Sequence, residues 1–134
     1  MNNSSKDFET LLERAIEHRE SHRYEEAIVD LNRAIEIDEG NLTAFVQRGL
    51  TFGQMALFEK ALADFDRAIA LNSQVGWVFT NRGIAYGLTG QFKEAIADFD
   101  RAIALDGTDI GALASRGETY REMGCLEEAL RDFN

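Results

Sequence analysis

The chain has 134 residues, the length of one compact domain or of a short repeat array. Hydrophobic residues make up 45% and charged residues 28%, a balance that is typical of soluble globular proteins and argues against a disordered chain. The formal net charge of -10 gives an acidic surface that repels phosphate backbones and anionic lipids, so we expect neither nucleic acid nor a membrane as partner.

The amino-terminal residues and the cysteine content bear on location. Residues 1–7 are polar, lack the apolar core of a signal peptide and are expected to form an N-terminal tail. Cys125 is the only cysteine, so no internal disulfide points to secretion. No apolar stretch approaches the length that spans a bilayer. A cytoplasmic location is therefore the default expectation.

Eight helices are predicted from the apolar spacing, and the absence of proline permits helices throughout. Gly83 and Tyr86 fall on one helix face, and Gly90 suits the left-handed position that ends a helix. Asn41 and Asp109 stand just before later helices and are expected to be N-caps. The predicted ranges are 8–21, 24–38, 42–55, 58–72, 76–89, 92–106, 110–123 and 126 to the end.

An internal repeat organises these helices into pairs. The segment 63–71 recurs letter for letter at 97–105, an offset of 34 residues. The same step relates three further series of residues, which are Tyr24, Phe58, Phe92 and Leu126; Ala27, Ala61, Ala95 and Ala129; and Leu31, Phe65, Phe99 and Phe133. Four passes at one period predict a stack of similar helix pairs.

Small residues in the first helix of each pair are expected to let the two helices approach closely. We expect Gly83 to face Ala95 across the pair, while Phe92 and Phe99 fill the gap to the next unit. One pair cannot bury its own apolar face, so stability requires the stacking of about three units.

The chain resembles the tetratricopeptide repeat family in a set of residues within one repeat, which are Gly83, Tyr86, Ala95, Phe99 and Ala102. The resemblance implies an all-α fold, a right-handed superhelical solenoid of antiparallel helix pairs. Its repeats span 8–41, 42–75 and 76–109, with an incomplete fourth repeat at 110–134. The glycine that this family places between the two helices is replaced by His22 and Ala56 in the first two repeats.

His18 and His22 lie four residues apart, the spacing of a metal-binding pair on a helix. However, Arg19 stands where a zinc-protease motif requires glutamate, and no third ligand is evident. We therefore interpret His18 as a packing residue and His22 as part of a turn, and we expect no metal and no cofactor. Because no nucleophile with a base and no phosphate-binding loop is recognisable, we expect no catalytic residues and no enzymatic activity.

Arginines and aspartates also recur with the repeat period. One interpretation is a cationic ladder for an acidic ligand. The other, which we favour because both signs recur together, is that each arginine pairs with an aspartate of its own or the adjacent repeat. The series are Arg14, Arg48, Arg82 and Arg116; Arg33, Arg67 and Arg101; and Asp30, Asp64, Asp98 and Asp132.

The resemblance further implies that the first helices of successive repeats line a concave groove. The groove face is then expected to carry Glu9, Leu12, Glu13, Ile16, Thr43, Val46, Gln47, Leu50, Gln54, Trp77, Thr80, Asn81, Ile84, Leu88, Gly111, Ala114, Ser115, Glu118 and Glu122. We expect a peptide or partner protein to contact the residues of this series from Thr43 to Glu118, apart from Gly111. The chaperone-binding subgroup holds carboxylates with lysine, arginine and asparagine at such positions, and only Asn81 matches it here.

Three positions on the groove face have open interpretations. Trp77 is either an exposed binding residue or packed on the preceding loop. Gly53 and Gly87 either admit a ligand backbone closely or are inherited from the duplication of the middle repeats. The sequence predicts a protein-binding scaffold in which Trp77, Leu50 and Ile84 carry most of the contact.

The incomplete fourth repeat supports an alternative, structural function. Its second helix stops at Asn134, and its exposed side is expected to lack the polar cap that solenoids need. Either the chain is a fragment of a longer array, or this side associates with a second copy to give a homodimer. The residues expected at that contact are Leu126, Ala129, Leu130 and Phe133.

Overall fold

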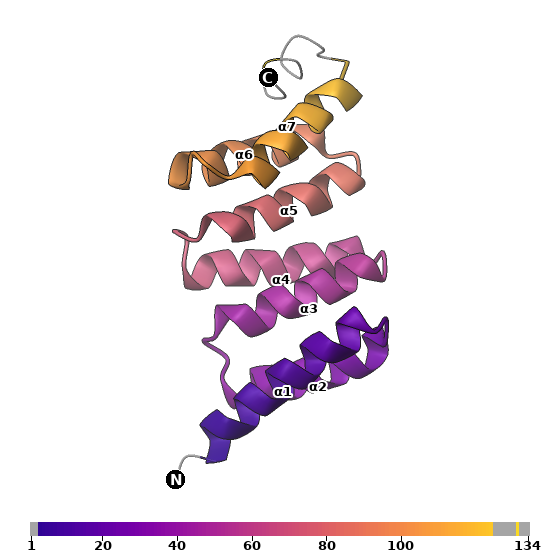
Figure 1. Ribbon diagram of the computed structural model, residues 1–134, viewed down its shortest axis with the longest axis vertical. Coiled ribbons are helices and arrows are strands. Elements are labelled where there is room, and N and C mark those ends of the chain that lie inside the picture. Colours follow the sequence, from indigo (N-terminus) through magenta and orange to yellow (C-terminus); the bar gives the residue numbers. More distant parts are fainter. Residues whose placement is uncertain (1–2, 125–130, 132–134) are drawn as a thin grey trace. The chain divides into compact units, whose positions relative to one another are not determined.

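The computed structural model describes residues 3–124 and 131, and that part of the chain contains helices and no strand (Figure 1). The all-helical prediction is therefore confirmed. The helices are α1 (Asn3–Glu20), α2 (Tyr24–Ile37), α3 (Leu42–Gln54), α4 (Phe58–Leu71), α5 (Gly76–Leu88), α6 (Phe92–Leu105) and α7 (Ile110–Glu122). The eighth predicted helix lies outside the described residues.

The helix boundaries agree with the prediction except at the amino-terminal end. Helices α2 to α7 begin at the expected residues and end one residue early. Helix α1 begins at Asn3, inside the segment expected to be a tail. No glycine or proline interrupts residues 3–7, so helical hydrogen bonding extends from the turn anchored by the buried Phe8 toward the terminus.

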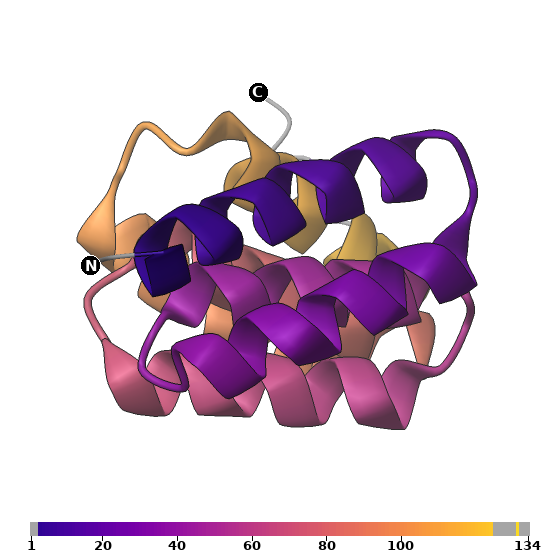
Figure 2. The ribbon, with the colours of Figure 1, turned by 90° about the horizontal axis from the view of Figure 1, so that it is seen from below.

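The chain divides into two compact units, residues 1–71 and 72–134, each a helical repeat solenoid. In the first unit, α1 packs against α2 and α3 packs against α4, and α2 joins the two pairs by packing against α3. Figure 2 shows α1 and α2 side by side as antiparallel helices. In the second unit, α5 packs against α6, and α7 packs against α6 and α5. None of the helices described combines the length and apolarity needed to cross a bilayer.

A glycine–phenylalanine contact holds the two helices of a repeat together. A Cβ atom added at Gly83 would lie 2.7 Å from Cε1 of Phe99, and one added at Gly49 would lie 2.8 Å from Cε1 of Phe65. The three atoms nearest to the Cβ position of Gly83 all belong to Phe99, so Phe99 is the residue of α6 that Gly83 meets most closely. Phe99 thus packs against α5 within its own repeat, and it also lines the space toward α7 of the next repeat, where it was expected.

The first repeat achieves the same packing with different side chains. Ala15, Ala27 and Leu31 form a buried cluster in which Ala15 and Leu31 occupy the positions of Gly83 and Phe99. The larger residue on the first helix is thus matched by a smaller residue on the second. The exchange of Gly and Phe for Ala and Leu keeps the combined size of the two side chains similar, which close packing favours.

The turn between the two helices of a repeat has one backbone conformation regardless of the residue it contains. The angle φ is 79° at Gly90 and 84° at Gly124, which confirms the left-handed turn predicted for Gly90. It is also positive at His22 (63°) and Ala56 (62°), where an L-residue is strained by contact between Cβ and the backbone. The turn geometry is therefore set by the helix packing, and the first two repeats adopt it at a cost in stability.

Both predicted N-caps are confirmed. The Asn41 side chain accepts a hydrogen bond from the Thr43 amide at 3.0 Å. The Asp109 side chain accepts one from the Ala112 amide, also at 3.0 Å. Each cap satisfies a backbone donor at the start of a first helix and so fixes where that helix begins.

Candidate functional site

The first arginine series is structural, as predicted. Three of its four arginines each donate two hydrogen bonds, 2.7 to 2.9 Å long, to an aspartate on the second helix of their own repeat, in the pairs Arg14–Asp30, Arg48–Asp64 and Arg82–Asp98. Asp132, the corresponding aspartate for Arg116, lies outside the described residues. The three aspartates are each 4% exposed. Because a carboxylate neutralises each of these arginines, buried for Arg14, Arg48 and Arg82 and exposed for Arg116, the pairs favour the structural interpretation over a cationic ladder for an acidic ligand.

The same arginines also tie consecutive repeats together. Nη1 of Arg48 donates to Oδ1 of Asn32 in the preceding repeat at 2.9 Å, and Nη1 of Arg116 donates to Oδ1 of Asp100 at 2.7 Å. The Arg14 guanidinium, through its hydrogen bonds and its charge, holds the pKa of the Asp30 carboxyl below its usual value. Within each unit the arginines therefore act as links between helices.

Two members of the second arginine series, Arg67 and Arg101, behave differently from the prediction. Cζ of Arg67 lies over the ring of Phe45, 5.7 Å from the ring centroid, and Cζ of Arg101 lies over the ring of Phe79, 5.8 Å from its centroid. Within the described residues neither guanidinium pairs with a carboxylate, so the expected aspartate pairing is wrong for these two residues. A cation held over an aromatic face is stabilised without a counter-ion.

The two histidines have separate partners. His18 Nε2 lies 3.6 Å from Oδ2 of Asp30, which already binds Arg14. Nδ1 of His22 lies 2.7 Å from the Tyr24 hydroxyl, and the positive φ of His22 places it in the turn after α1, as interpreted from the sequence. No group of three or more potential ligands that could hold a metal occurs among residues 3–124 and 131.

In the first unit, the expected groove residues of α3 are largely engaged within the protein. Val46 is completely buried, so the expectation that it contacts a ligand is wrong. Gln47 and Gln54 accept hydrogen bonds from Arg19 of α1, at 3.1 Å from Nη2 and 3.2 Å from Nη1. Leu50 is half-buried. Helix α1 thus engages two of the α3 residues that were expected to meet a ligand, through the single side chain of Arg19.

A wide depression lies at the amino-terminal end of the same unit and has a volume of about 520 Å³. It includes three expected groove residues, Glu9, Leu12 and Thr43. The other residues of its lining come from the first turns of α1 and from the loop after α2, namely Ser4, Ser5, Phe8, Ile37, Asp38 and Asn41. Its mixed, loop-bordered lining offers no continuous apolar face.

In the second unit, α5 presents an exposed apolar stripe. Trp77 is 48% exposed, Ile84 41% and Leu88 64%, and the helical spacing places them on one face together with the half-buried Asn81. This answers the open question about Trp77, which is exposed. Thr80, also expected on the groove face, donates its hydroxyl to Oδ2 of Asp109 at 3.1 Å and so joins α5 to the start of α7.

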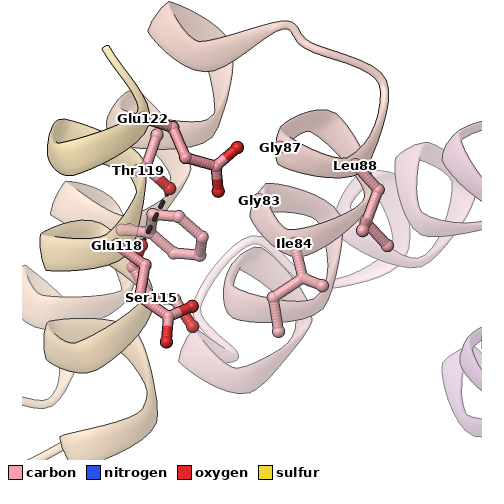
Figure 3. A pocket seen from close by; sticks show the side chains of 9 residues that line it. Gly83, Ile84, Gly87, Leu88, Ser115, Glu118, Thr119 and Glu122 are labelled. Carbon is pink, nitrogen blue, oxygen red and sulfur yellow. Dashed lines mark hydrogen bonds between the residues drawn. The ribbon is translucent and has the colours of Figure 1, made fainter. Parts of the chain in front are cut away.

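Between α5 and α7 lies a second depression, of about 430 Å³, which we call the α5–α7 depression (Figure 3). Ile84 and Leu88 form its apolar wall on α5, and Glu118 and Glu122 extend from α7 across from them. The remaining lining residues are Gly83, Gly87, Phe99, Ser115 and Thr119. Its two walls thus differ in chemical character, one apolar and the other acidic.

The α7 wall holds its own polar groups in place. Thr119 is 6% exposed, and its hydroxyl donates to the backbone carbonyl of Ser115 at 2.8 Å. Ser115 and Ala114, both expected groove residues, are half-buried, whereas Glu118 and Glu122 are exposed. Among residues 3–124 and 131, neither glutamate forms an ion pair or a side-chain hydrogen bond. The two carboxylates are available to a ligand.

Arg19 is the residue that inspection of the sequence missed. The repeat step places Arg19 in register with Gly53 and Gly87, the two glycines already assigned to the groove face. A Cβ atom at Gly53 would meet nothing within 4 Å, and one at Gly87 would meet only the Thr119 hydroxyl at 4.0 Å. Close packing therefore does not require glycine at either position, and aligning the three repeats would have exposed the difference.

The predicted self-association surface, Leu126, Ala129, Leu130 and Phe133, lies outside the described residues, as does Cys125. The structure therefore neither supports nor opposes the homodimer, which stays a prediction.

Comparisons with known proteins identify the repeats. Tetratricopeptide repeat profiles match residues 8–41, 42–75 and 76–109. A search of curated proteins gives no match. A crystal structure of MamA is 25% identical with a TM-score of 0.86, over 94% of this chain and 74% of MamA. Two further solved structures share the fold. The first repeat domain of Spaghetti, bound to an HSP90 peptide, is 22% identical with a TM-score of 0.85, over 90% of this chain and 95% of that domain. PilF of Pseudomonas aeruginosa is 19% identical with a TM-score of 0.89, over 98% of this chain and 60% of PilF. Because the repeat profiles match well over half of its length, this chain belongs to the tetratricopeptide repeat family.

Proposed function

We propose that the chain is a protein-interaction module whose second unit binds a segment of a partner protein along α5 and the α5–α7 depression. The observation that carries this proposal is the exposed stripe of Trp77, Ile84 and Leu88 beside a depression that is open to a ligand. A peptide bound in the Spaghetti domain, which has the same fold, supports the kind of function but not the identity of the partner.

Elementary energetics favour the stripe as a contact surface. Burying apolar surface gains about 25 cal/mol per Å², and a large aromatic side chain is a common source of binding energy. Three exposed apolar side chains on one helix face supply such area without any rearrangement of the core. The Asn81 amide between them provides donors and an acceptor for the backbone of an extended segment.

Trp77 also makes the proposal testable, because it is the only tryptophan in the chain. Peptides selected from a random dodecapeptide display library should change the intrinsic fluorescence of Trp77 on binding. In a calorimetric titration, Trp77→Ala should weaken the tightest of these peptides by at least about tenfold, the loss expected for a central aromatic contact.

The matched control is Val29→Ala, which removes a comparably exposed apolar side chain (57% exposed) from α2. It should leave the affinity unchanged. Equal losses in Trp77→Ala and Val29→Ala, or no loss in either, would place binding on another surface. A library that yields no peptide at all would refute the function.

A further inference from the structure

We propose that the α5–α7 depression accepts an arginine side chain of the partner, with the guanidinium against Glu118 and Glu122 and the aliphatic stem against Ile84 and Leu88. The inference rests on the proposed function and specifies the chemistry of the ligand. It is carried by a comparison between two repeat junctions of the same chain.

The junction between the first and second repeats already contains an arginine. Arg19 extends from α1 to α3, where Nη2 donates to Gln47 and Nη1 donates to Gln54, at 3.1 and 3.2 Å. Its Nε atom is buried and has no hydrogen-bond partner. The two terminal nitrogens of one planar group thus bridge two acceptors that are two helical turns apart on α3.

The equivalent junction between α5 and α7 lacks this side chain. Gly87 occupies the position of Arg19, two repeats later, and the space that an arginine would fill is the α5–α7 depression. Its volume of about 430 Å³ is many times the share of one water molecule, about 30 Å³. The chain therefore has the same junction in two states, one filled by its own arginine and one open.

The positions of the two amide acceptors in the filled junction, Gln47 and Gln54, are occupied by Ser115 and Glu122 in the open one. Glu122 stands where the first junction has Gln54, and Glu118 stands where it has Leu50. A neutral amide and an apolar side chain are thus replaced by two carboxylates, neither of which has an ion-pair partner among residues 3–124 and 131. Charge-assisted hydrogen bonds are stronger than neutral ones, and the second carboxylate adds an acceptor on a wall where Arg19 has none.

The shape of the depression favours arginine over a small cation. Its apolar wall of Ile84 and Leu88 suits the methylene stem of a long side chain, while the charged end reaches the acidic wall (Figure 3). A planar guanidinium can bridge two separated acceptors, whereas a compact ammonium group binds as a point charge. The net charge of -10 attracts such a ligand from solution.

The test uses the full-length chain and the random dodecapeptide display library. Selected peptides should be enriched in arginine, and replacing that arginine with citrulline, its neutral isostere, should weaken binding at least tenfold. The Glu118→Gln/Glu122→Gln variant should bind the arginine and citrulline peptides about equally. Raising the salt concentration should weaken binding of the arginine peptide to the wild-type chain.

A second variant tests whether an arginine of the chain itself can occupy the depression. Gly87→Arg should fill the depression from α5, as Arg19 fills the first junction, and should abolish binding of the arginine peptide while raising the thermal midpoint. The matched control is Val29→Arg, which adds the same side chain at an exposed position of α2 that does not line the depression, and which should leave the affinity for the arginine peptide within about twofold.

The outcomes separate this inference from the proposed function. Peptides that depend on Trp77 but show no arginine preference, and that bind the double glutamine variant as well as the wild type, overturn the inference and leave the function standing. Retained arginine-peptide binding by Gly87→Arg also overturns it. If no peptide binds, both proposals fail.

Discussion

Replacing Gly83 with alanine tests why the first helix of a repeat carries so small a residue. The added Cβ atom would lie 2.7 Å from Cε1 of Phe99 and 3.0 Å from two further ring carbons. Phe99 is 1% exposed, so its ring has little room to move, and we expect an overpacking cost of about 1–3 kcal/mol. Alanine returns about 0.8–1 kcal/mol of helix propensity. The free energy of unfolding should therefore fall by about 1 kcal/mol.

The first repeat indicates how this loss can be reversed. There, Ala15 and Leu31 occupy the two positions and are each 1% exposed. Phe99→Leu alone should cost about 1–3 kcal/mol, less than truncation of a buried phenylalanine to alanine. In Gly83→Ala/Phe99→Leu the new methyl group fills part of the space that the ring vacates. We expect a coupling free energy of about 1–2 kcal/mol in favour of the double variant, within the range for residues in contact.

Urea unfolding of the wild type, the two single variants and the double variant measures this coupling. Unfolding is followed by far-ultraviolet circular dichroism, which reports on helix content, and by Trp77 fluorescence. The second signal matters because repeat arrays need not unfold in one step, and Trp77 reports on the repeat that carries both substitutions. Gly53→Ala is the control. A Cβ atom there would meet nothing within 4 Å, so this variant should gain about 0.8–1 kcal/mol. Additive losses in the double variant, within about 0.5 kcal/mol, would refute the volume-compensation reasoning.

Two further predictions concern the turns and the buried ion pairs. Ala56→Gly should raise the urea midpoint, with a gain of roughly 0.5–1 kcal/mol in the free energy of unfolding. Glycine removes the strain of the positive φ of 62°, and this gain exceeds the cost of the greater entropy of the unfolded chain. A lower midpoint would contradict the presence of strain. Asp30→Asn should lower stability at pH 7 by roughly 1–3 kcal/mol, since the Arg14 pair holds the pKa of Asp30 below its usual value. That contribution is full above the unfolded-state pKa of about 3.9 and is lost as the pH falls through the folded-state pKa. Stability measured from pH 7 to pH 2 should therefore fall less in the variant, and equal slopes would count against the pair.

Features that depend on the repeat step were predictable from the sequence. The repeat step predicted the starts of α2 to α7. The recurrence of both charge signs predicted that Arg48 pairs with an aspartate of its own or the adjacent repeat, and the partner is Asp64 of its own repeat. Each of these features lies within one repeat, or between neighbours with the same register. One correct alignment of the repeats therefore determines several contacts at once.

Features that depend on how one helix covers another were not predictable. Helical spacing put Val46 on the same face as Gln47 and Leu50, but it carries no information on whether a preceding helix covers that face. Likewise, spacing did not distinguish an arginine that pairs with a carboxylate from Arg101, which stacks on Phe79. These outcomes depend on distances between helices, which periodicity does not encode.

The contrast between Arg19 and Gly87 has an evolutionary consequence. Glycine and arginine codons can differ by a single base, so one point mutation is enough to convert an open repeat junction into a filled one, or the reverse. Because each repeat contributes its own junction, an array built by duplication can change the number and position of its open sites without altering its length or its core. Partner choice in such an array could then diverge one codon at a time while the scaffold stays the same.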